Sequence, residues 1–225
     1  MIKKLLEYSI QNNLRHIPSA LSQYSYLKNI LPELDYKNTN ISIGKPFGSQ
    51  AYYVIWEEMG LVQQPLSYGV KHEEIDFVNF SEETLGNALG VAGGLMFNDK
   101  KTFVNLSDGA FQMGPTLEAV QFIGHHQKDV LLCVDCNDMQ LTGNTNSILS
   151  QNINTIADIL SSNGWDVLII DDEMSEYLIQ EILERYTPTA LLFKTTKGQG
   201  VKEMEEDSVK WHYKELKDIN EITIK

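Results

Sequence analysis

Short apolar runs alternate with longer amphipathic segments through the second half of the chain. Continuous apolar runs bounded by turn residues predict buried strands, and apolar residues three or four positions apart predict helices. The predicted strands span 101–107, 129–136, 165–171 and 189–196, and the predicted helices between them span 113–126, 154–164 and 175–186. This succession predicts an α/β fold: a doubly wound, mostly parallel sheet with helices on both faces.

The first hundred residues follow a different pattern. Helical spacing of apolar residues occurs over 2–13, 49–59 and 84–97, and the polar, turn-rich stretches 44–49 and 62–74 predict loops. No shift in composition marks a linker, and no segment repeats. We therefore expect one domain over residues 1–225.

The charge balance excludes nucleic acid as a partner. Thirty-one Asp and Glu residues against 18 Lys and Arg residues give a formal net charge of −13, which repels nucleic acid but leaves room for a local site that binds a small anion. The N-terminal residues lack the apolar core of a signal peptide, and no stretch approaches the ~18 apolar residues of a membrane helix. We expect a cytoplasmic protein that binds neither membrane nor nucleic acid.

The two cysteines, Cys133 and Cys136, stand in LLCVDCND. A C-x-x-C spacing can indicate a zinc or redox site, but a structural zinc needs about four ligands and the chain has no second pair. In a strand, a spacing of three places the two thiols on opposite faces. We expect two buried strand cysteines.

A carboxylate and a carboxamide follow two neighbouring predicted strands. Asp108 ends the strand over 101–107, and Asn137, 29 positions later, ends the strand over 129–136. Neighbouring carboxyl ends of parallel strands meet at one edge, and such oxygen ligands suit Mg²⁺. Gly109 would let phosphates approach the backbone, and a following helix N-terminus would favour an anion. An Asp at a helix start and an Asn in a turn are also common, so spacing alone leaves both interpretations open.

These segments resemble the transketolase family. LSDGAFQMGPTLEAVQFIGHH and VDCNDMQLTG are similar to the two halves of its thiamine diphosphate motif, and TTKGQGVKEMEEDSVKWHY (195–213) is similar to its Lys-Gly-x-Gly loop and Trp-His ending. TLGNALGVAGGL resembles the helix before the motif, and residues 13–22 and 51–60 echo earlier family segments more weakly. The resemblance spans nearly the whole chain and implies the diphosphate-binding (PP-type) domain of the thiamine diphosphate-binding fold.

The resemblance implies a metal site and a cofactor. Asp108, Asn137 and the backbone carbonyl of Met139 would bind Mg²⁺. Gly109 would contact the diphosphate of thiamine diphosphate through its amide.

Four further residues gain expected roles from the resemblance. Ala110 and Ser81 would contact the cofactor. His212 would reach both the diphosphate and the substrate, and His16 would lie near the substrate, so we treat both histidines as candidate catalytic residues.

The sequence also departs from the family pattern. Met113 stands where the family usually has a glutamate that links paired active sites, and FSEET (80–84) replaces a glycine-rich loop that faces the aminopyrimidine. The loop that begins at 44 lacks a family histidine, for which Lys45 could substitute as a cation. His72 lies in a predicted loop where a substrate histidine could sit. These losses suggest a substrate other than an ordinary pentose phosphate.

The resemblance also implies a partner. The family's catalytic glutamate lies on a pyrimidine-binding domain that would follow this region, and the chain ends soon after the Trp-His segment. We expect a split transketolase-like transferase in which a separate subunit supplies that domain, with an α₂β₂ assembly. It would move a two-carbon ketol unit between sugars or sugar phosphates.

The residues are also compatible with two other functions. The first is decarboxylation of a 2-oxo acid with acyl transfer, which uses the same cofactor. The second is a non-catalytic subunit that uses the fold for assembly; the altered loops favour it, and the retained Asp108 and Asn137 argue against it.

Overall fold

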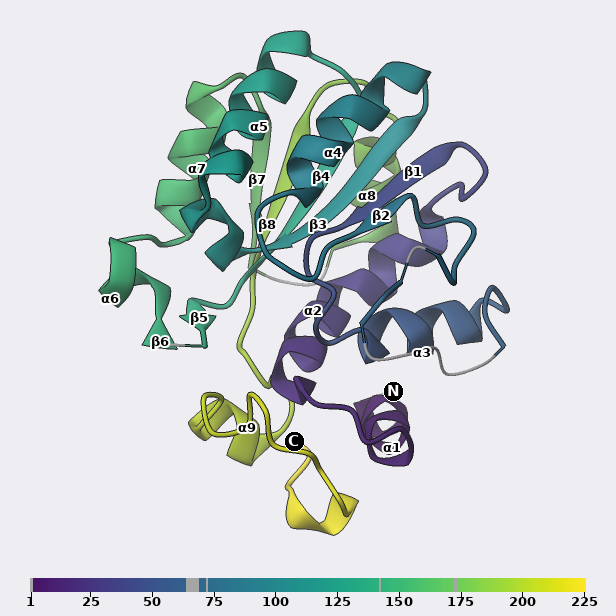
Figure 1. Ribbon diagram of the computed structural model, residues 1–225, viewed down its shortest axis with the longest axis vertical. Coiled ribbons are helices and arrows are strands. Elements are labelled where there is room, and N and C mark those ends of the chain that lie inside the picture. Colours follow the sequence, from purple (N-terminus) through teal and green to yellow (C-terminus); the bar gives the residue numbers. More distant parts are fainter. Residues whose placement is uncertain (1, 64–68, 72, 142, 172–173) are drawn as a thin grey trace.

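A parallel sheet forms the centre of the molecule in a computed structural model that describes residues 2–63, 69–71, 73–141, 143–171 and 174–225 (Figure 1). Within these residues, six strands pair in the order β2-β1-β3-β4-β8-β7, and every pair is parallel. The strands are β1 (Thr39–Ile43), β2 (Phe80–Ser81), β3 (Lys101–Ser107), β4 (Val130–Cys136), β7 (Asp166–Ile170) and β8 (Thr189–Lys194). A separate antiparallel ribbon is formed by β5 (Met139–Gln140) and β6 (Gly143–Asn144).

Helices cover both faces of this sheet (Figure 1). The first face carries α4 (Ala88–Leu95), α5 (Gly114–His126) and α7 (Ile153–Ser162), and the second carries α2 (Ile17–Ile30), α3 (Gln50–Glu58) and α8 (Glu176–Leu183). The remaining helical segments are α1 (Ile2–Gln11), α6 (Thr145–Leu149), α9 (Lys202–Glu206) and the 3₁₀ turns η1 (Leu31–Glu33), η2 (Met96–Asn98), η3 (Asp108–Gln112) and η4 (Ile219–Glu221). The predicted α/β fold, with helices on both faces, is confirmed.

Strand β4 shows how each core is built from alternating residues. Leu131 and Cys133 enter the core on the α2 face, whereas Val134 and Cys136 enter the core on the α5 face. Both cysteines are buried and free, as expected. Asp135 shares the strand parity of Cys133, so its side chain points toward α2.

Two elements of the first half have no clear signature in the sequence. Helix α2 is buried except at three partly exposed residues, Ser25, Lys28 and Asn29. Because polar residues also lie on its buried faces, apolar residues do not recur at the helical spacing that would predict a helix. Strand β1 reads TNISI although it is buried throughout. Its polar groups are bonded inside: Asn40 Nδ2 donates to Asn98 Oδ1 at 2.9 Å, and Ser42 Oγ donates to the Ala88 carbonyl at 2.9 Å.

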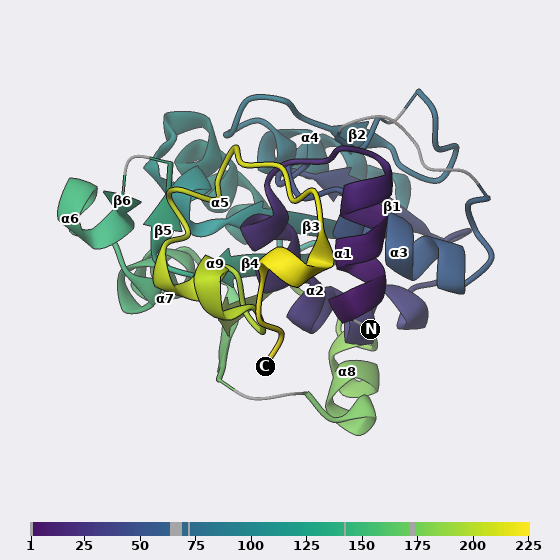
Figure 2. The same ribbon diagram turned by 90° about the horizontal axis from the view of Figure 1, so that it is seen from below.

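The C-terminal segment lies beyond the carboxyl ends of the strands, next to α1 and the start of α2 (Figures 1 and 2). The His16 amide donates to the His212 carbonyl at 3.2 Å, and Arg15 forms an ion pair with Glu215 at 3.2 Å. These contacts bring a residue near each end of the sequence to the same edge of the sheet. None of the helices in the described residues has the length and apolar character needed to cross a membrane.

Candidate functional site

A cavity of about 460 Å³ lies at the carboxyl edge of the sheet. Its lining includes Lys45 after β1, Asp108 after β3, Asn137 after β4 and Lys197 after β8. Four adjacent strands thus each bring a polar side chain to one place. Doubly wound sheets bind their ligands at this edge, where successive strand ends converge.

Asp108 is the carboxylate of this cavity. It is 2% exposed, its Oδ1 accepts from the Gly109 amide at 2.7 Å, and its Oδ2 accepts from the Asp138 amide at 2.8 Å. Burial raises the pKa of Asp108, and the nearby positive charge of Lys45 opposes that rise. Each carboxylate oxygen accepts one of these hydrogen bonds and keeps a lone pair for another ligand.

Asn137 and Met139 continue the chain from β4 into the cavity. The Asn137 Oδ1 accepts from the Met139 amide at 3.0 Å, and the Met139 carbonyl accepts from Lys197 Nζ at 3.2 Å. The predicted neighbours Asp108 and Asn137 therefore line the same cavity, together with Met139.

A 3₁₀ turn separates Asp108 from the helix that follows it. The chain enters the 3₁₀ turn η3, and α5 begins at Gly114 with Pro115 in its first turn. The helix predicted over 113–126 is thus found to within one residue, and η3 separates its N-terminus from Asp108.

Two buried ammonium groups face the carboxylate. Lys45 is 6% exposed and Lys197 is 5% exposed, and both line the cavity. Burial lowers the pKa of Lys197 to about 8 and also lowers that of Lys45, while the negative charge of Asp108 raises both. Lys45 and Lys197 place cationic groups beside the Asp108 carboxylate in a strongly acidic chain.

Asp135, which sequence reasoning did not single out, supports this arrangement from behind. It is fully buried and forms an ion pair with Lys45. Its signal in the sequence is a lone acidic residue inside the apolar run LLCVDC, because a charge buried in a strand needs a partner.

His16 and His212 form the aromatic part of the cavity wall. Their ring centroids lie 4.6 Å apart in an edge-on arrangement, and Phe47 lies 4.9 Å from His16. His16 has a left-handed backbone (φ 57°, ψ 29°), which is uncommon for a residue other than glycine. Burial lowers the pKa of His16 to about 3 and that of His212 to about 4, and nearby positive groups add to both shifts. Both imidazoles are therefore neutral at pH 7.

Acid should destabilise the chain through His16. The pKa is lowered in the folded state, so the stabilisation is present above the unfolded value of about 6.5 and is lost as pH falls below it. Between pH 7 and pH 5 we expect roughly 2 kcal/mol less unfolding free energy from this group. The His16→Asn variant, which tolerates the left-handed backbone, should lose that part of the pH dependence in denaturant titrations. Replacing the exposed His125 with asparagine serves as the control, and equal pH dependence in all three proteins would contradict the assignment.

The other predicted cofactor residues lie at different distances from the cavity. Gly109 lines it, and a Cβ on Gly109 would point among Ser107, Leu85 and Gln140, which also line it. Ala110 is buried beneath the turn and is not among the lining residues, and Ser81 donates its hydroxyl hydrogen to the Val70 carbonyl at 2.5 Å, also outside the lining. The cofactor contacts of Ala110 and Ser81 stay predictions.

The loops at 44–49 and 80–84, which depart from the pattern expected from the sequence resemblance, both shape the cavity wall. Phe47 occupies the wall beside His16. Glu82 is buried, and its carboxylate accepts from the amides of Gly86, Asn87 and Ala88 at 3.1, 2.6 and 2.8 Å, which closes the turn that places Leu85 in the wall.

The structure describes Met113 but not His72. Met113, at the junction of η3 and α5, is half-buried and packs beside Gly86. His72 lies outside the described residues.

Comparison with known proteins gives a consistent result. The profile described as "Transketolase, thiamine diphosphate binding domain" matches residues 64–224. Transketolase-like protein 2 of Bos taurus is 27% identical over 201 residues, covering 80% of this chain and 32% of its own length. Transketolase of Rattus norvegicus is 25% identical over 198 residues, covering 80% and 31%. The chain thus spans about a third of the length of these curated relatives.

Solved structures share the fold. A transketolase from Campylobacter jejuni superposes with a TM-score of 0.65 at 18% identity, covering 94% of this chain and 40% of that one. A transketolase from Leishmania mexicana gives a TM-score of 0.62 at 15% identity, covering 90% and 38%.

Proposed function

The chain belongs to the transketolase family through its thiamine diphosphate binding domain, and we propose that it is the magnesium- and diphosphate-binding subunit of an enzyme that transfers a two-carbon ketol unit between sugars. The observation that carries the proposal is the convergence of Asp108, Asn137 and Met139 on one cavity with two buried lysines.

The oxygen atoms of this cavity fit Mg²⁺. In the described residues no three His, Cys, Asp or Glu side chains gather to hold a metal, so the proposed ligands are one carboxylate, one amide oxygen and one carbonyl. Mg²⁺ commonly takes one or two protein carboxylates and completes its six ligands with water and phosphate oxygens. We assign Asp108, Asn137 Oδ1 and the Met139 carbonyl as ligands, each of which keeps a lone pair beside its present hydrogen bond.

The remaining polar groups suit the diphosphate. Lys197 and Lys45 provide positive charge, and Gly109 leaves the space that a side chain would fill. The Gly109 amide now donates to Asp108 Oδ1, so it reaches a phosphate by sharing or releasing that hydrogen bond. When bound, thiamine diphosphate supplies a carbon nucleophile and an electron sink for cleavage beside a carbonyl.

The two histidines would act on the substrate side. As neutral imidazoles, His16 and His212 can each donate one hydrogen bond and accept another, which suits hydroxyl groups of a sugar. Phe47 beside them offers no polar group, which favours a sugar other than an ordinary pentose phosphate. Ketol transfer uses a ketose as donor, whereas the decarboxylase alternative uses a 2-oxo acid. Comparing the rates of the assembled complex with these two donors distinguishes the two functions.

We also propose that residues 1–225 act as a single domain completed by a partner. The chain spans about a third of the length of its curated relatives. A separate subunit would supply the pyrimidine-binding domain with its catalytic glutamate, in an α₂β₂ heterotetramer.

Calorimetry on the assembled complex tests cofactor binding. Thiamine diphosphate should bind in the presence of Mg²⁺ and should bind at least tenfold more weakly after chelation, because the two anionic phosphates would then lack a cation that balances their charge. Thiamine, which lacks both phosphates, is the matched control and should show no metal dependence. Equal affinities for the two compounds in Mg²⁺ would refute the proposal.

A further inference from the structure

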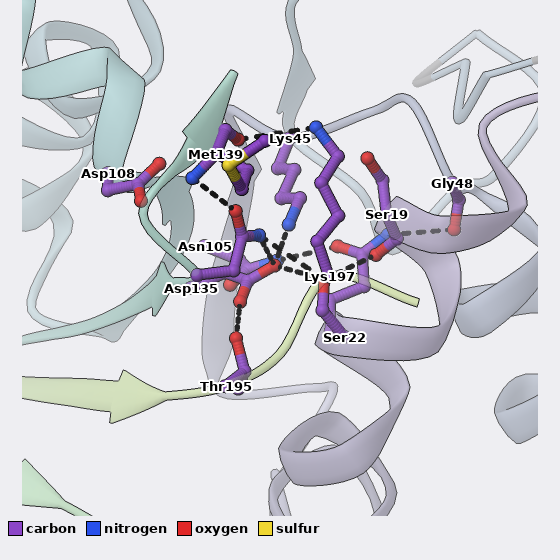
Figure 3. Close-up of polar contacts among 12 residues, drawn as sticks. Ser19, Ser22, Lys45, Gly48, Asn105, Asp108, Asp135, Met139, Thr195 and Lys197 are labelled. Carbon is purple, nitrogen blue, oxygen red and sulfur yellow. Dashed lines mark hydrogen bonds and ion pairs between the residues drawn. The ribbon is translucent and has the colours of Figure 1, made fainter. Parts of the chain in front are cut away.

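The carboxylate of Asp135 receives four side-chain donors from four different parts of the chain (Figure 3). Ser22 Oγ on α2 donates at 2.6 Å, Asn137 Nδ2 donates at 3.1 Å, and Thr195 after β8 and Lys45 after β1 complete the set. Asp135 itself does not line the cavity, whereas Lys45 and Asn137 do. The carboxylate therefore lies one layer behind the residues that meet a ligand.

The four contacts decide which way the Asn137 amide faces. An ionised carboxylate only accepts hydrogen bonds, so the Asn137 group that meets Asp135 must be the NH₂. Ser22 gives its hydroxyl hydrogen to Asp135, so its oxygen also acts as an acceptor toward Asn137 Nδ2, at 3.4 Å. Asp135 and Ser22 therefore both require the amide nitrogen of Asn137 on this side.

The opposite side of the amide requires oxygen. The Met139 amide donates to Asn137 Oδ1 at 3.0 Å. A flipped amide would set its oxygen against the Asp135 carboxylate and its NH₂ against the Met139 N–H, which loses both hydrogen bonds. The network thus selects a single orientation on chemical grounds, independent of the assignment of nitrogen and oxygen in the side chain.

We propose that Asp135 is a positioning residue that presents the oxygen of Asn137 to the metal. The inference rests on the proposed function, because it gives Asn137 Oδ1 a cation to bind. Supporting residues of this kind commonly change metal affinity by about 10–100-fold when they are lost.

Two substitutions separate positioning from charge. Asp135→Leu removes the acceptor that Asn137 needs. Asp135→Asn can keep an amide oxygen toward Asn137, Ser22 and Lys45 while its NH₂ donates to Thr195. Both variants remove the negative charge beside Lys45, so they differ mainly in the acceptor.

The test is Mg²⁺ affinity in the assembled complex with saturating thiamine diphosphate, measured by calorimetry. Asp135→Leu should weaken Mg²⁺ binding at least tenfold, and Asp135→Asn should stay within about threefold of the unchanged protein. The side-chain amide NMR signals of Asn137 should shift in Asp135→Leu and stay near their original positions in Asp135→Asn. Equal losses in the two variants, or no loss in either, would overturn the inference.

A second pair of variants tests the inference even if the first pair does not fold. A buried lysine without its carboxylate is costly, so the same comparison is repeated in a Lys45→Met background, where both partners of the ion pair are removed. Here too the leucine variant should bind Mg²⁺ at least tenfold more weakly than the asparagine variant. An Asp108→Ala sample tests the proposed function in the same assay: if it binds Mg²⁺ normally, the metal site is wrong, whereas if it alone loses binding, the inference on Asp135 is wrong.

Discussion

The Asp108→Ala variant is expected to abolish Mg²⁺-dependent binding of thiamine diphosphate by the assembled complex. Asp108 is the sole carboxylate among the described residues that line the cavity, and it lies at the end of β3 beside Lys45 and Lys197. Without it the metal would be left with an amide oxygen and a carbonyl, which carry no charge to balance Mg²⁺. Calorimetry with the diphosphate cofactor should show no heat that depends on Mg²⁺.

Two controls keep this result specific. Asp129→Asn changes a carboxylate at the amino end of β4, paired with Lys101 and remote from the cavity, and should leave cofactor affinity within about threefold. Circular dichroism and thermal unfolding of Asp108→Ala should show a folded protein. A folded Asp108→Ala complex with unchanged cofactor affinity would rule out the assigned metal site.

Strands β3, β4, β7 and β8 and the meeting of Asp108 with Asn137 could be predicted because they follow from local patterns. Strands β3 and β4 are continuous apolar runs, and parallel neighbours must end at the same edge. The two polar residues that follow them are therefore brought together by topology alone.

Other parts depend on tertiary contacts that no local pattern records. Helix α2 is buried on nearly all sides, so its Ser and Gln residues hide the helical period. Asp135 reads as an isolated acid in a strand, and its partners Ser22 and Thr195 lie 113 and 60 positions away. Such a network can be inferred only once the fold has placed its members together.

The sequence alone also does not show which side chains of the cavity are charged at pH 7. The residue types predict two lysines and two histidines as possible cations at pH 7. Burial lowers the pKa of His16 to about 3 and of His212 to about 4, so both histidines are neutral and the positive charge resides on the lysines. In the proposed function, Lys45 and Lys197 would supply the positive charge near the diphosphate, and the imidazoles would form hydrogen bonds to hydroxyl groups.

The purified chain on its own should show no catalytic activation of the cofactor, and its partner should restore it. The residues that line the cavity can hold a metal and a diphosphate, but in the proposed function the glutamate that activates the pyrimidine is on the partner. Exchange of the C2 proton of thiamine diphosphate with deuterium, followed by NMR, measures this activation without requiring the sugar substrate.

In that assay, the chain alone should match free cofactor, and the chain with its partner, sought first in the neighbouring reading frame, should accelerate exchange by at least about 100-fold. The partner combined with Asp108→Ala serves as the matched control and should give no acceleration, because the cofactor would not be held. Acceleration by the chain alone, or sugar turnover without a second subunit, would contradict the split enzyme while leaving the metal site intact. Cofactor binding by Asp108→Ala and proton exchange by the chain alone therefore test separate points: the first depends on whether Asp108 anchors the cofactor, and the second on whether the catalytic group lies on another chain.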